Sequence, residues 1–198
     1  MNSSVNKKTE INTSFELVVI GASLGGLIAL QTIVEKLSET FSIPMAVVIH
    51  RQHTESSGLV HLIKKHTPHS VIEPEDKMKL EKGYIYIAPM GYHLLVNGSH
   101  FSLSMDEPVH HSRPSIDVLF DTAAFSKKRQ LAGIILTGSG KDGIEGLRQV
   151  KLYGGYTIVQ NPEMAECGIL PKKVIEYTVP DLVLPLDGIT EVLNRLST

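Results

Sequence analysis

A strand that runs into a glycine-rich turn and then into a helix is predicted for residues 15–37, and it restricts the fold more than any other feature. Residues 17–20 form a short apolar run with β-branched side chains, which indicates a strand buried on both faces. Small residues follow at positions 21–26, and apolar residues then recur at helical spacing through about Leu37. Such a strand belongs to a parallel sheet covered by helices.

Ser23 stands in the middle of this turn, where its hydroxyl is expected near the N-terminus of the helix. Ser23 could simply cap that helix. However, Gly21, Gly25 and Gly26 leave room for a ligand to approach the backbone, which a cap does not require. The pattern Gly21-x-Ser23-x-Gly25 matches the nucleophile elbow of serine hydrolases, whereas a glycine-rich turn after the first strand also suits the pyrophosphate of a dinucleotide.

The dinucleotide interpretation lacks two required features. Its fingerprint is G-x-G-x-x-G, and residues 21–26 read GASLGG. It also needs an acidic residue about 20 positions further on, and the second predicted strand ends in His-Arg-Gln-His at residues 50–53. The sequence therefore favours a hydrolase, and a nucleotide-binding protein is the weaker alternative.

Composition excludes several classes of protein. The chain has 198 residues, 42% hydrophobic and 20% charged, with a formal net charge of −2, which suits one α/β domain. No basic region indicates nucleic-acid binding, and no apolar run approaches the roughly 18 residues of a membrane span. The single cysteine, Cys167, excludes an internal disulfide and predicts a cytoplasmic location. No cluster has zinc-ligand spacing, so neither a metal nor an organic cofactor is expected.

Strands and helices alternate at both ends of the chain. We predict a disordered polar leader over residues 1–14 and one domain over residues 15–198. Asn97-Gly98 predicts a two-residue hairpin turn, and Pro114 is expected at the first position of a helix. Strands are expected at residues 17–20, 45–49, 71–72, 84–88, 93–96, 101–103, 131–136, 156–160 and 182–184. The predicted fold is a doubly wound, mostly parallel α/β sheet with helices on both faces and a small antiparallel hairpin insert.

Three strand ends carry reactive side chains at the edge of the sheet where ligands bind. They supply Ser23, the histidines at positions 50 and 53, and Asp142, which are the three groups of a Ser-His-Asp relay. Spacing alone does not separate His50 from His53. The loop character of residues 54–57 favours His53, because a base has to reach across to the serine. The order Ser, His, Asp and the early serine differ from the α/β-hydrolases.

Other side chains fit this chemistry less well. Asp142 has an alternative role, because Asp-Gly is common in turns and acidic residues stabilise helix N-termini. Asp117 and Asp121 fall within a predicted helix, where an exposed carboxylate is expected. Cys167 has acidic neighbours and no histidine after it, which disfavours a thiolate, so a structural role is expected.

Six segments carry a resemblance to a known family. They are residues 21–26 (GASLGG), Gln52-His53, Ala88-Pro89, residues 113–120 (RPSIDVLF), residues 136–143 (LTGSGKDG) and Gln160-Asn161. In unbroken order from about Leu17 to the C-terminus, the chain resembles the catalytic domain of the CheB-type protein-glutamate methylesterases of bacterial chemotaxis.

This resemblance implies hydrolysis of γ-glutamyl methyl esters on a methyl-accepting chemotaxis receptor, and deamidation of certain receptor glutamines. It implies Ser23 as nucleophile, His53 as base and Asp142 as the partner that orients the base. It also implies an oxyanion hole that includes the N–H of Ser139. Substrate contacts are expected from Leu24, Gly25, Arg113 and His111. The expected partner is thus a receptor protein, with no nucleic acid and no membrane insertion.

The chain also departs from the family pattern. Leu24 replaces the usual small polar residue, Gly138-Ser139-Gly140 replaces Gly-Met-Gly, and residues 161–171 differ from the usual run. These positions are expected at the mouth of the site, so altered substrate contacts are predicted. The family commonly carries an N-terminal receiver domain, for which the 14 residues before the first predicted strand leave no room. A non-catalytic receptor-docking module of the same fold is the main alternative to an enzyme.

Overall fold

A seven-stranded parallel sheet forms the centre of the computed structural model, which describes residues 14–50 and 58–197. The strand order is β3-β4-β2-β1-β7-β8-β9, so the order reverses at β1. The strands are β1 (Leu17–Ala22), β2 (Met45–Ile49), β3 (Ser70–Ile72), β4 (Tyr84–Ile87), β7 (Leu131–Ile135), β8 (Tyr156–Gln160) and β9 (Leu182–Leu184). The first 13 residues of the polar leader predicted at residues 1–14 lie outside the described residues.

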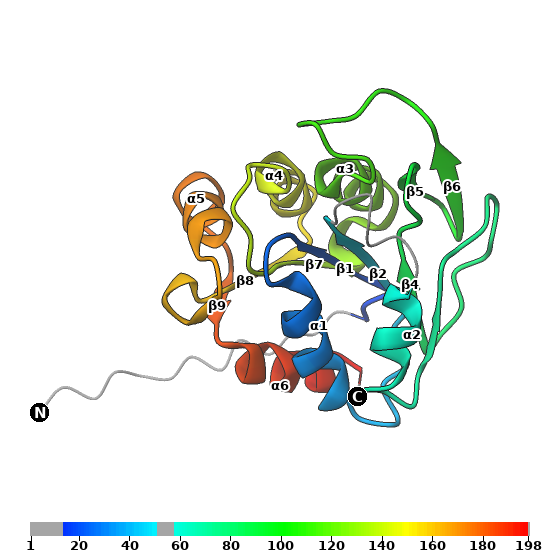
Figure 1. Ribbon diagram of the computed structural model, residues 1–198, viewed down its shortest axis with the longest axis horizontal. Helices are drawn as coiled ribbons and strands as arrows, with labels where there is room; N and C mark the ends of the chain where they lie inside the picture. The colour runs from blue at the N-terminus through cyan, green and yellow to red at the C-terminus, as the bar shows by residue number, and fades with distance from the viewer. Residues whose placement is uncertain (1–13, 51–57, 198) are drawn as a thin grey trace, which may run out of the picture.

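Helices cover both faces of this sheet (Figure 1). One layer contains α1 (Gly26–Glu35), α2 (Leu59–Lys64) and α6 (Leu186–Leu196). The other contains α3 (Ile116–Lys127), α4 (Ile144–Leu152) and α5 (Ile169–Thr178), and the short helices η2 (Lys128–Gln130) and η3 (Pro162–Met164) complete the elements. Alternate side chains of a strand point to opposite faces, so Val18 joins the core under α1 and Val19 the core under α3. All six residues of β1 are buried, as predicted.

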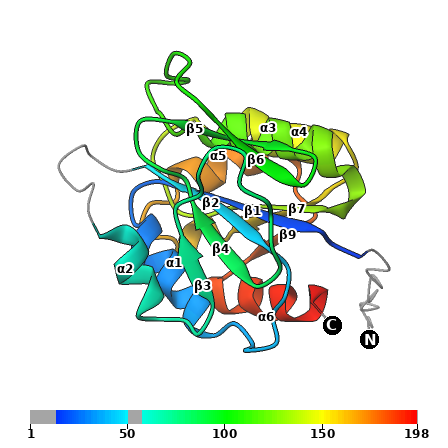
Figure 2. The same cartoon turned by 90° about the vertical axis from the view of Figure 1, so that its right-hand side faces the viewer.

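The predicted antiparallel hairpin is confirmed as β5 (His93–Asn97) and β6 (His100–Ser104). It lies on the same side of the sheet as α3 and α4 (Figure 2). Gly98 adopts a φ of 60° in the turn, and the Phe101 ring packs edge-on against Tyr86 of β4 with 4.7 Å between centroids. The hairpin thus adds a small second sheet over the helical layer of α3.

One helix prediction is wrong, and one helix was not predicted. Pro114 does not begin α3, because Ser115 caps this helix by accepting a hydrogen bond from the Val118 N–H at 3.4 Å. Helix α5 was not predicted from its sequence, since Pro171 breaks the helical pattern. Pro171 is tolerated there because it lies in the first turn, where backbone N–H groups have no partner within the helix. Within the described ranges, no helix has the length and apolar character required to span a membrane.

Candidate active site

The carboxyl ends of β1, β2 and β7 bring Ser23, His50 and Asp142 to one edge of the sheet. Ala22 pairs with Ile49 of β2, and the His50 N–H donates to the Ala22 carbonyl at 3.0 Å. Ala22 and Ile49 face the core under α1. Because side chains alternate, the next residues, Ser23 and His50, face the opposite layer, where α3 and α4 begin.

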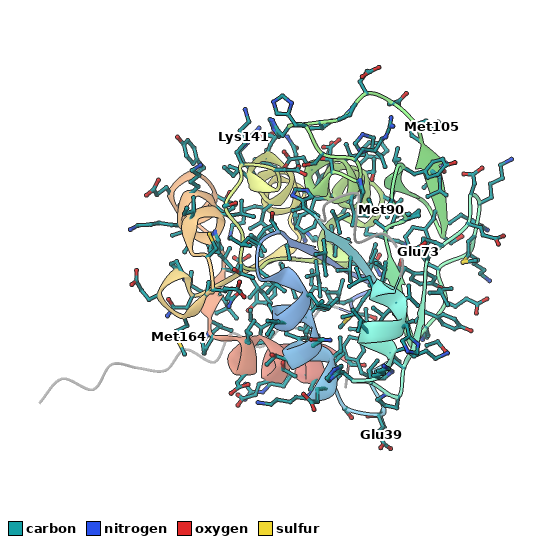
Figure 3. The ribbon with its side chains drawn as sticks, in the orientation of Figure 1. Glu39, Glu73, Met90, Met105, Lys141 and Met164 are labelled. Atoms are coloured by element: carbon teal, nitrogen blue, oxygen red, sulfur yellow. The ribbon has the colours of Figure 1, made fainter. Side chains whose placement is uncertain are left out.

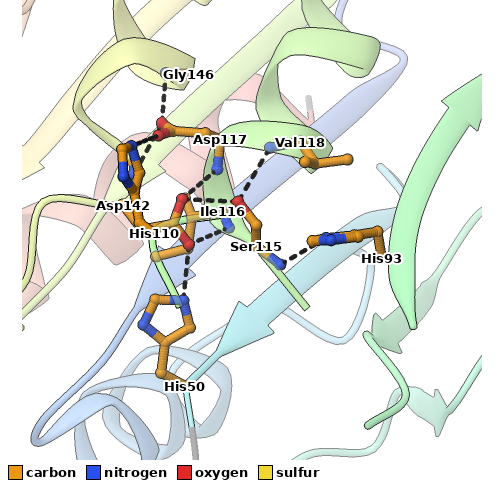
Figure 4. Close-up of polar contacts among 10 residues, drawn as sticks. His50, His93, His110, Ser115, Ile116, Asp117, Val118, Asp142 and Gly146 are labelled. Atoms are coloured by element: carbon orange, nitrogen blue, oxygen red, sulfur yellow. Dashed lines mark hydrogen bonds and ion pairs between the residues drawn. The ribbon is translucent and has the colours of Figure 1, made fainter. Parts of the chain in front are cut away.

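His50 and Asp142 form a hydrogen bond of 2.8 Å between Nε2 and Oδ2 (Figure 4). The Asp142 side chain is 3% exposed, and it accepts three more hydrogen bonds from the start of α3. The Ser115 hydroxyl and the Asp117 N–H donate to Oδ1 at 2.8 and 2.9 Å, and the Ile116 N–H donates to Oδ2 at 2.8 Å. Asp142 therefore orients an imidazole while it holds the first turn of a neighbouring helix.

These hydrogen bonds set the charge of Asp142. Burial acts to raise the pKa of its carboxyl, but hydrogen bonds from His50, from two backbone N–H groups and from the Ser115 hydroxyl outweigh burial and lower it. Asp142 is therefore a carboxylate at neutral pH, as the acceptor of an imidazole N–H must be.

Asp117 holds the second helix in the same manner. Its Oδ1 accepts from the N–H groups of Gly143 and Gly146 at 2.8 and 2.7 Å, at the start of α4. Asp142 lies just before α4 and caps α3, whereas Asp117 lies in α3 and caps α4. Asp117 was expected to be exposed but is buried, because α4 packs directly over it. Burial raises the pKa of Asp117 to about 6, and the charge of Asp142 adds to this effect while the two N–H groups oppose it.

Two further histidines flank these aspartates. His110 Nε2 lies 3.4 Å from Asp117 Oδ2. His93 is buried, its Nδ1 accepts from the Ser115 N–H at 3.2 Å, and its Nε2 lies 3.2 Å from the Glu107 carbonyl. Nε2 therefore carries the proton of a neutral His93 ring. His93 thus holds Ser115, which caps α3 and donates its hydroxyl proton to Asp142.

Ser23 lies at the corner between β1 and α1. Its N–H donates to the Thr137 carbonyl at 3.0 Å, and a Cβ added to Gly138 would lie 3.0 Å from Ser23 Cβ. Glycine at position 138 therefore lets the loop after β7 approach the serine. Within residues 14–50 and 58–197, the Ser23 hydroxyl forms no hydrogen bond to His50. Ser23 is partly exposed.

Backbone N–H groups near Ser23 remain open as well. The hydrogen bonds of the described residues use neither the Ser139 N–H nor the Leu24 N–H. Gly138 is held on both sides, because its N–H donates to the Cys167 carbonyl at 2.9 Å and its carbonyl accepts from the Leu170 N–H at 2.8 Å. The predicted oxyanion donor Ser139 thus follows a fixed residue and is exposed to solvent.

The rim of the site includes an exposed apolar residue and an acidic side chain. Leu24 is 58% exposed, and Gly25 has a φ of 80° at the start of α1. A Cβ at Gly25 would lie 2.7 Å from Glu166 Oε2, so the Glu166 side chain covers this glycine. Met164 and Lys141 project outward on two sides of the molecule (Figure 3).

Two of the predicted substrate contacts, Arg113 and His111, have other surroundings than the His50–Asp142 pair. Arg113 donates through Nη1 to the carbonyls of Met105 and Asp106 at 2.8 and 3.0 Å, so it holds the loop after β6. His111 is exposed with a φ of 64°. In the described part of the chain, neither Arg113 nor His111 is hydrogen-bonded to Asp142 or His50.

The family resemblance implies His53 as the partner of Asp142, and the hydrogen bond observed within the described residues is with His50. His53 lies outside the described residues. The position of His50 directly after β2 is the sequence signal for its contact with Asp142. Ser115 and Asp117 belong to the RPSIDVLF segment at residues 113–120, but their roles as helix caps were not predicted. Among the described residues, no group of three or more His, Cys, Asp or Glu could hold a metal ion.

Comparison with known proteins identifies the family. Residues 18–193 match the model of the CheB methylesterase family. A Leptospira interrogans protein named "Putative protein-glutamate methylesterase/protein-glutamine glutaminase" is 40% identical over 184 residues, covering 92% of this chain and 95% of that protein. A Thermotoga maritima protein-glutamate methylesterase/protein-glutamine glutaminase is 35% identical over 192 residues, covering 95% of this chain and 56% of that protein.

A solved structure confirms the predicted fold. The crystal structure of the Thermotoga maritima CheB methylesterase catalytic domain superimposes with a TM-score of 0.88 at 35% identity, covering 93% of this chain and all of that chain. Both the mostly parallel sheet with helices on its two faces and the small antiparallel sheet are thereby accounted for. By sequence and by fold, this chain belongs to the CheB methylesterase family.

Proposed function

We propose that this chain hydrolyses γ-glutamyl methyl esters on a bacterial chemoreceptor, with Ser23 as nucleophile, His50 as base and Asp142 as the group that orients the base. The observation that carries the proposal is the hydrogen bond between His50 and the buried Asp142, beside the serine at the corner of β1. The names of the relatives supply the substrate class.

The proposed reaction begins at the His50 ring. With Nε2–H donated to Asp142, Nδ1 carries the lone pair that takes the proton of Ser23 Oγ. Oγ attacks the ester carbonyl carbon, and the resulting oxyanion accepts hydrogen bonds from the N–H groups of Ser139 and Leu24. Collapse breaks the bond to the methoxy group, which leaves as methanol with the proton from His50. Water then attacks the acyl-enzyme by the same route and releases the glutamate carboxylate.

His50 is preferred to His53 as the base for two reasons. Strand pairing brings His50 next to Ser23 on the same face of the sheet, and Asp142 binds its ring. An aspartate that stabilises the imidazolium has to contact the imidazole that takes the proton. His53 stays the alternative, and substitution of each histidine separates the two assignments.

The same groups would deamidate a receptor glutamine. Attack of Ser23 on a carboxamide gives the same acyl-enzyme, with ammonia as the leaving group after protonation by His50. The glutaminase half of the relatives' names supports this second activity. We place both activities in the cytoplasm, where the single cysteine would stay reduced.

A serine-directed fluorophosphonate tests the proposal. The wild-type protein should be labelled and should release methanol from a methylated receptor, and Ser23→Ala should abolish both. Ser42→Ala, at the opposite end of the sheet, is the matched control and should retain both. Labelling of Ser23→Ala at the wild-type level would contradict the serine nucleophile. Absence of labelling and of methanol release from the folded wild-type protein would favour the non-catalytic docking module instead.

A further inference from the structure

Thr137 is a buried residue in which every polar group contacts a different part of the site. It is 1% exposed and follows β7. Its N–H donates to Gln160 Oε1 at 2.8 Å, and its carbonyl accepts from the Ser23 N–H at 3.0 Å. Thr137 thus joins the end of β8 to the turn that carries the proposed nucleophile.

The hydroxyl of Thr137 is also fully used. It accepts from the Cys167 N–H at 2.9 Å and donates to the Leu24 carbonyl at 2.8 Å, with the Cys167 carbonyl further away at 3.3 Å. A hydroxyl has one proton, and the donor at Cys167 occupies one of its lone pairs. The proton is therefore directed to Leu24, the residue after Ser23.

Two peptide planes near Ser23 are fixed in this way. The Leu24 carbonyl and the Gly25 N–H belong to one planar trans peptide and point in opposite directions. The hydroxyl of Thr137 holds the carbonyl, so it sets the orientation of the whole plane. The Leu170 N–H holds the Gly138 carbonyl in the same manner, which directs the Ser139 N–H away from α5. Only the first of these planes is held by a side chain.

We infer that Thr137 is a positioning residue, whose hydroxyl keeps the turn of Ser23 in register with the loop that supplies the Ser139 N–H. The inference rests on the function proposed above, because that function makes Ser23 the nucleophile and the Ser139 N–H a donor of the oxyanion hole. Valine has nearly the shape of threonine but cannot hydrogen-bond to Leu24 and Cys167, so the turn would keep only its backbone bond from the Ser23 N–H to the carbonyl of residue 137. A displacement of about 1 Å between reacting groups lowers a rate by about 100-fold.

Thr137→Val and Thr137→Ser test this inference on a methylated receptor. Thr137→Val should lower kcat by about 10- to 100-fold and leave KM within about twofold, because the hydroxyl contacts the turn and not the substrate. Fluorophosphonate labelling should slow by the same factor. Thr137→Ser keeps the hydroxyl and should restore kcat to within about threefold of wild type. A residue that only stabilised the fold would change the melting temperature and leave the kcat of folded protein unchanged.

Thr190→Val is the matched control. Thr190 is also buried, and its hydroxyl donates to the Leu186 carbonyl at 3.1 Å within α6, remote from Ser23. Its kcat should equal that of wild type. Equal kcat values in Thr137→Val and Thr190→Val would overturn the inference, and so would a Thr137→Ser variant as slow as Thr137→Val.

A second variant keeps the inference testable if Thr137→Val does not fold. Gln160→Met removes the acceptor of the Thr137 N–H, and the same loss of kcat with unchanged KM is expected. A kcat within about twofold of wild type would count against the inference. Failure of the wild-type protein to label at Ser23 would instead refute the proposed function, and the positioning role with it. Ser23-dependent labelling that is equally fast in wild type and Thr137→Val would refute the positioning role alone.

Discussion

The two ends of the sheet hold their carboxylates by different means. At the carboxyl end, Asp142 and Asp117 are buried, and in the described ranges neither forms an ion pair with a lysine or arginine. At the amino end, Glu16 is 47% exposed and pairs with Lys127 at 2.9 Å. Asp181, before β9, accepts from Lys151 and from Thr157.

This difference distinguishes ion pairs at the surface from buried carboxylates in a functional site. A partly exposed pair such as Glu16–Lys127 contributes little to stability, because water solvates the separated charges nearly as well. A buried carboxylate without a cation destabilises the fold unless hydrogen bonds replace its hydration. At the carboxyl end, the N–H groups that begin α3 and α4 supply those hydrogen bonds. Side chains whose pKa is shifted by burial are concentrated at functional sites.

The largest effect is expected from the imidazole at the carboxyl end. His50→Ala should lower kcat for methanol release on the order of 10⁵-fold, because Ser23 loses its base. His53→Ala is the matched comparison and should stay within about threefold of wild type. Circular dichroism should show both variants folded. The reverse pattern, a silent His50→Ala and an inactive His53→Ala, would return the base to the histidine first predicted.

Asp142→Asn should follow, with a loss of about 10³- to 10⁴-fold in kcat. The amide cannot stabilise the imidazolium of His50, and it presents donors to a site already filled with donors. Steady-state kinetics on Asp142→Asn, His50→Ala and the double variant provide the measurement. The double variant should be little slower than His50→Ala, whereas fully additive losses would show that the two groups do not act as one unit.

Asp117→Asn should change how stability depends on pH. The pKa of Asp117 is raised from 3.8 to about 6 in the folded protein, so folding favours its neutral form. Its contribution is fully present below about pH 4 and is lost as the pH rises through about 6. Asparagine does not titrate and still accepts from Gly143 and Gly146. Between pH 4 and pH 7.5, the variant should therefore gain about 2 to 3 kcal/mol in free energy of unfolding relative to wild type.

Urea unfolding at a series of pH values measures this difference, and Asp121→Asn on the exposed side of α3 is its control. The control should show a difference that is nearly independent of pH. The lowered pKa of Asp142 acts in the opposite sense, since that stability is lost as the pH falls, but Asp142 is present in all three proteins. If the stability difference between Asp117→Asn and wild type were equally independent of pH, the contrast between the two ends of the sheet would be contradicted.

The smallest effect is expected at the amino end. Glu16→Gln should change the free energy of unfolding by less than about 1 kcal/mol, because the lost pair with Lys127 is partly solvated. kcat for methanol release should be that of wild type. A loss of more than about 2 kcal/mol in free energy of unfolding, or a lower kcat, would contradict the contrast between the two ends of the sheet.

Local sequence determined most of the fold. The apolar runs of β1, β2 and β7 predict buried parallel strands because no polar side chain interrupts them. Asn97-Gly98 predicts the hairpin because both residues tolerate a positive φ. Ser23 and Asp142 follow from the same reasoning, since each stands in a glycine-rich turn directly after such a run. Helix α5 escaped prediction because Pro171 hides the helical pattern.

Tertiary structure alone decided which groups meet. The pairing of β2 with β1 and the cap that Asp142 forms on α3 bring His50 into contact with Asp142, whereas His53, three positions later, lies outside the described residues. Burial of Asp117 likewise depends on α4 packing over α3, which the sequence pattern around Asp117 does not predict. Local sequence fixes strands, turns and helices through backbone preferences and side-chain spacing. Partners of a polar side chain come from segments distant in the chain, so packing assigns them.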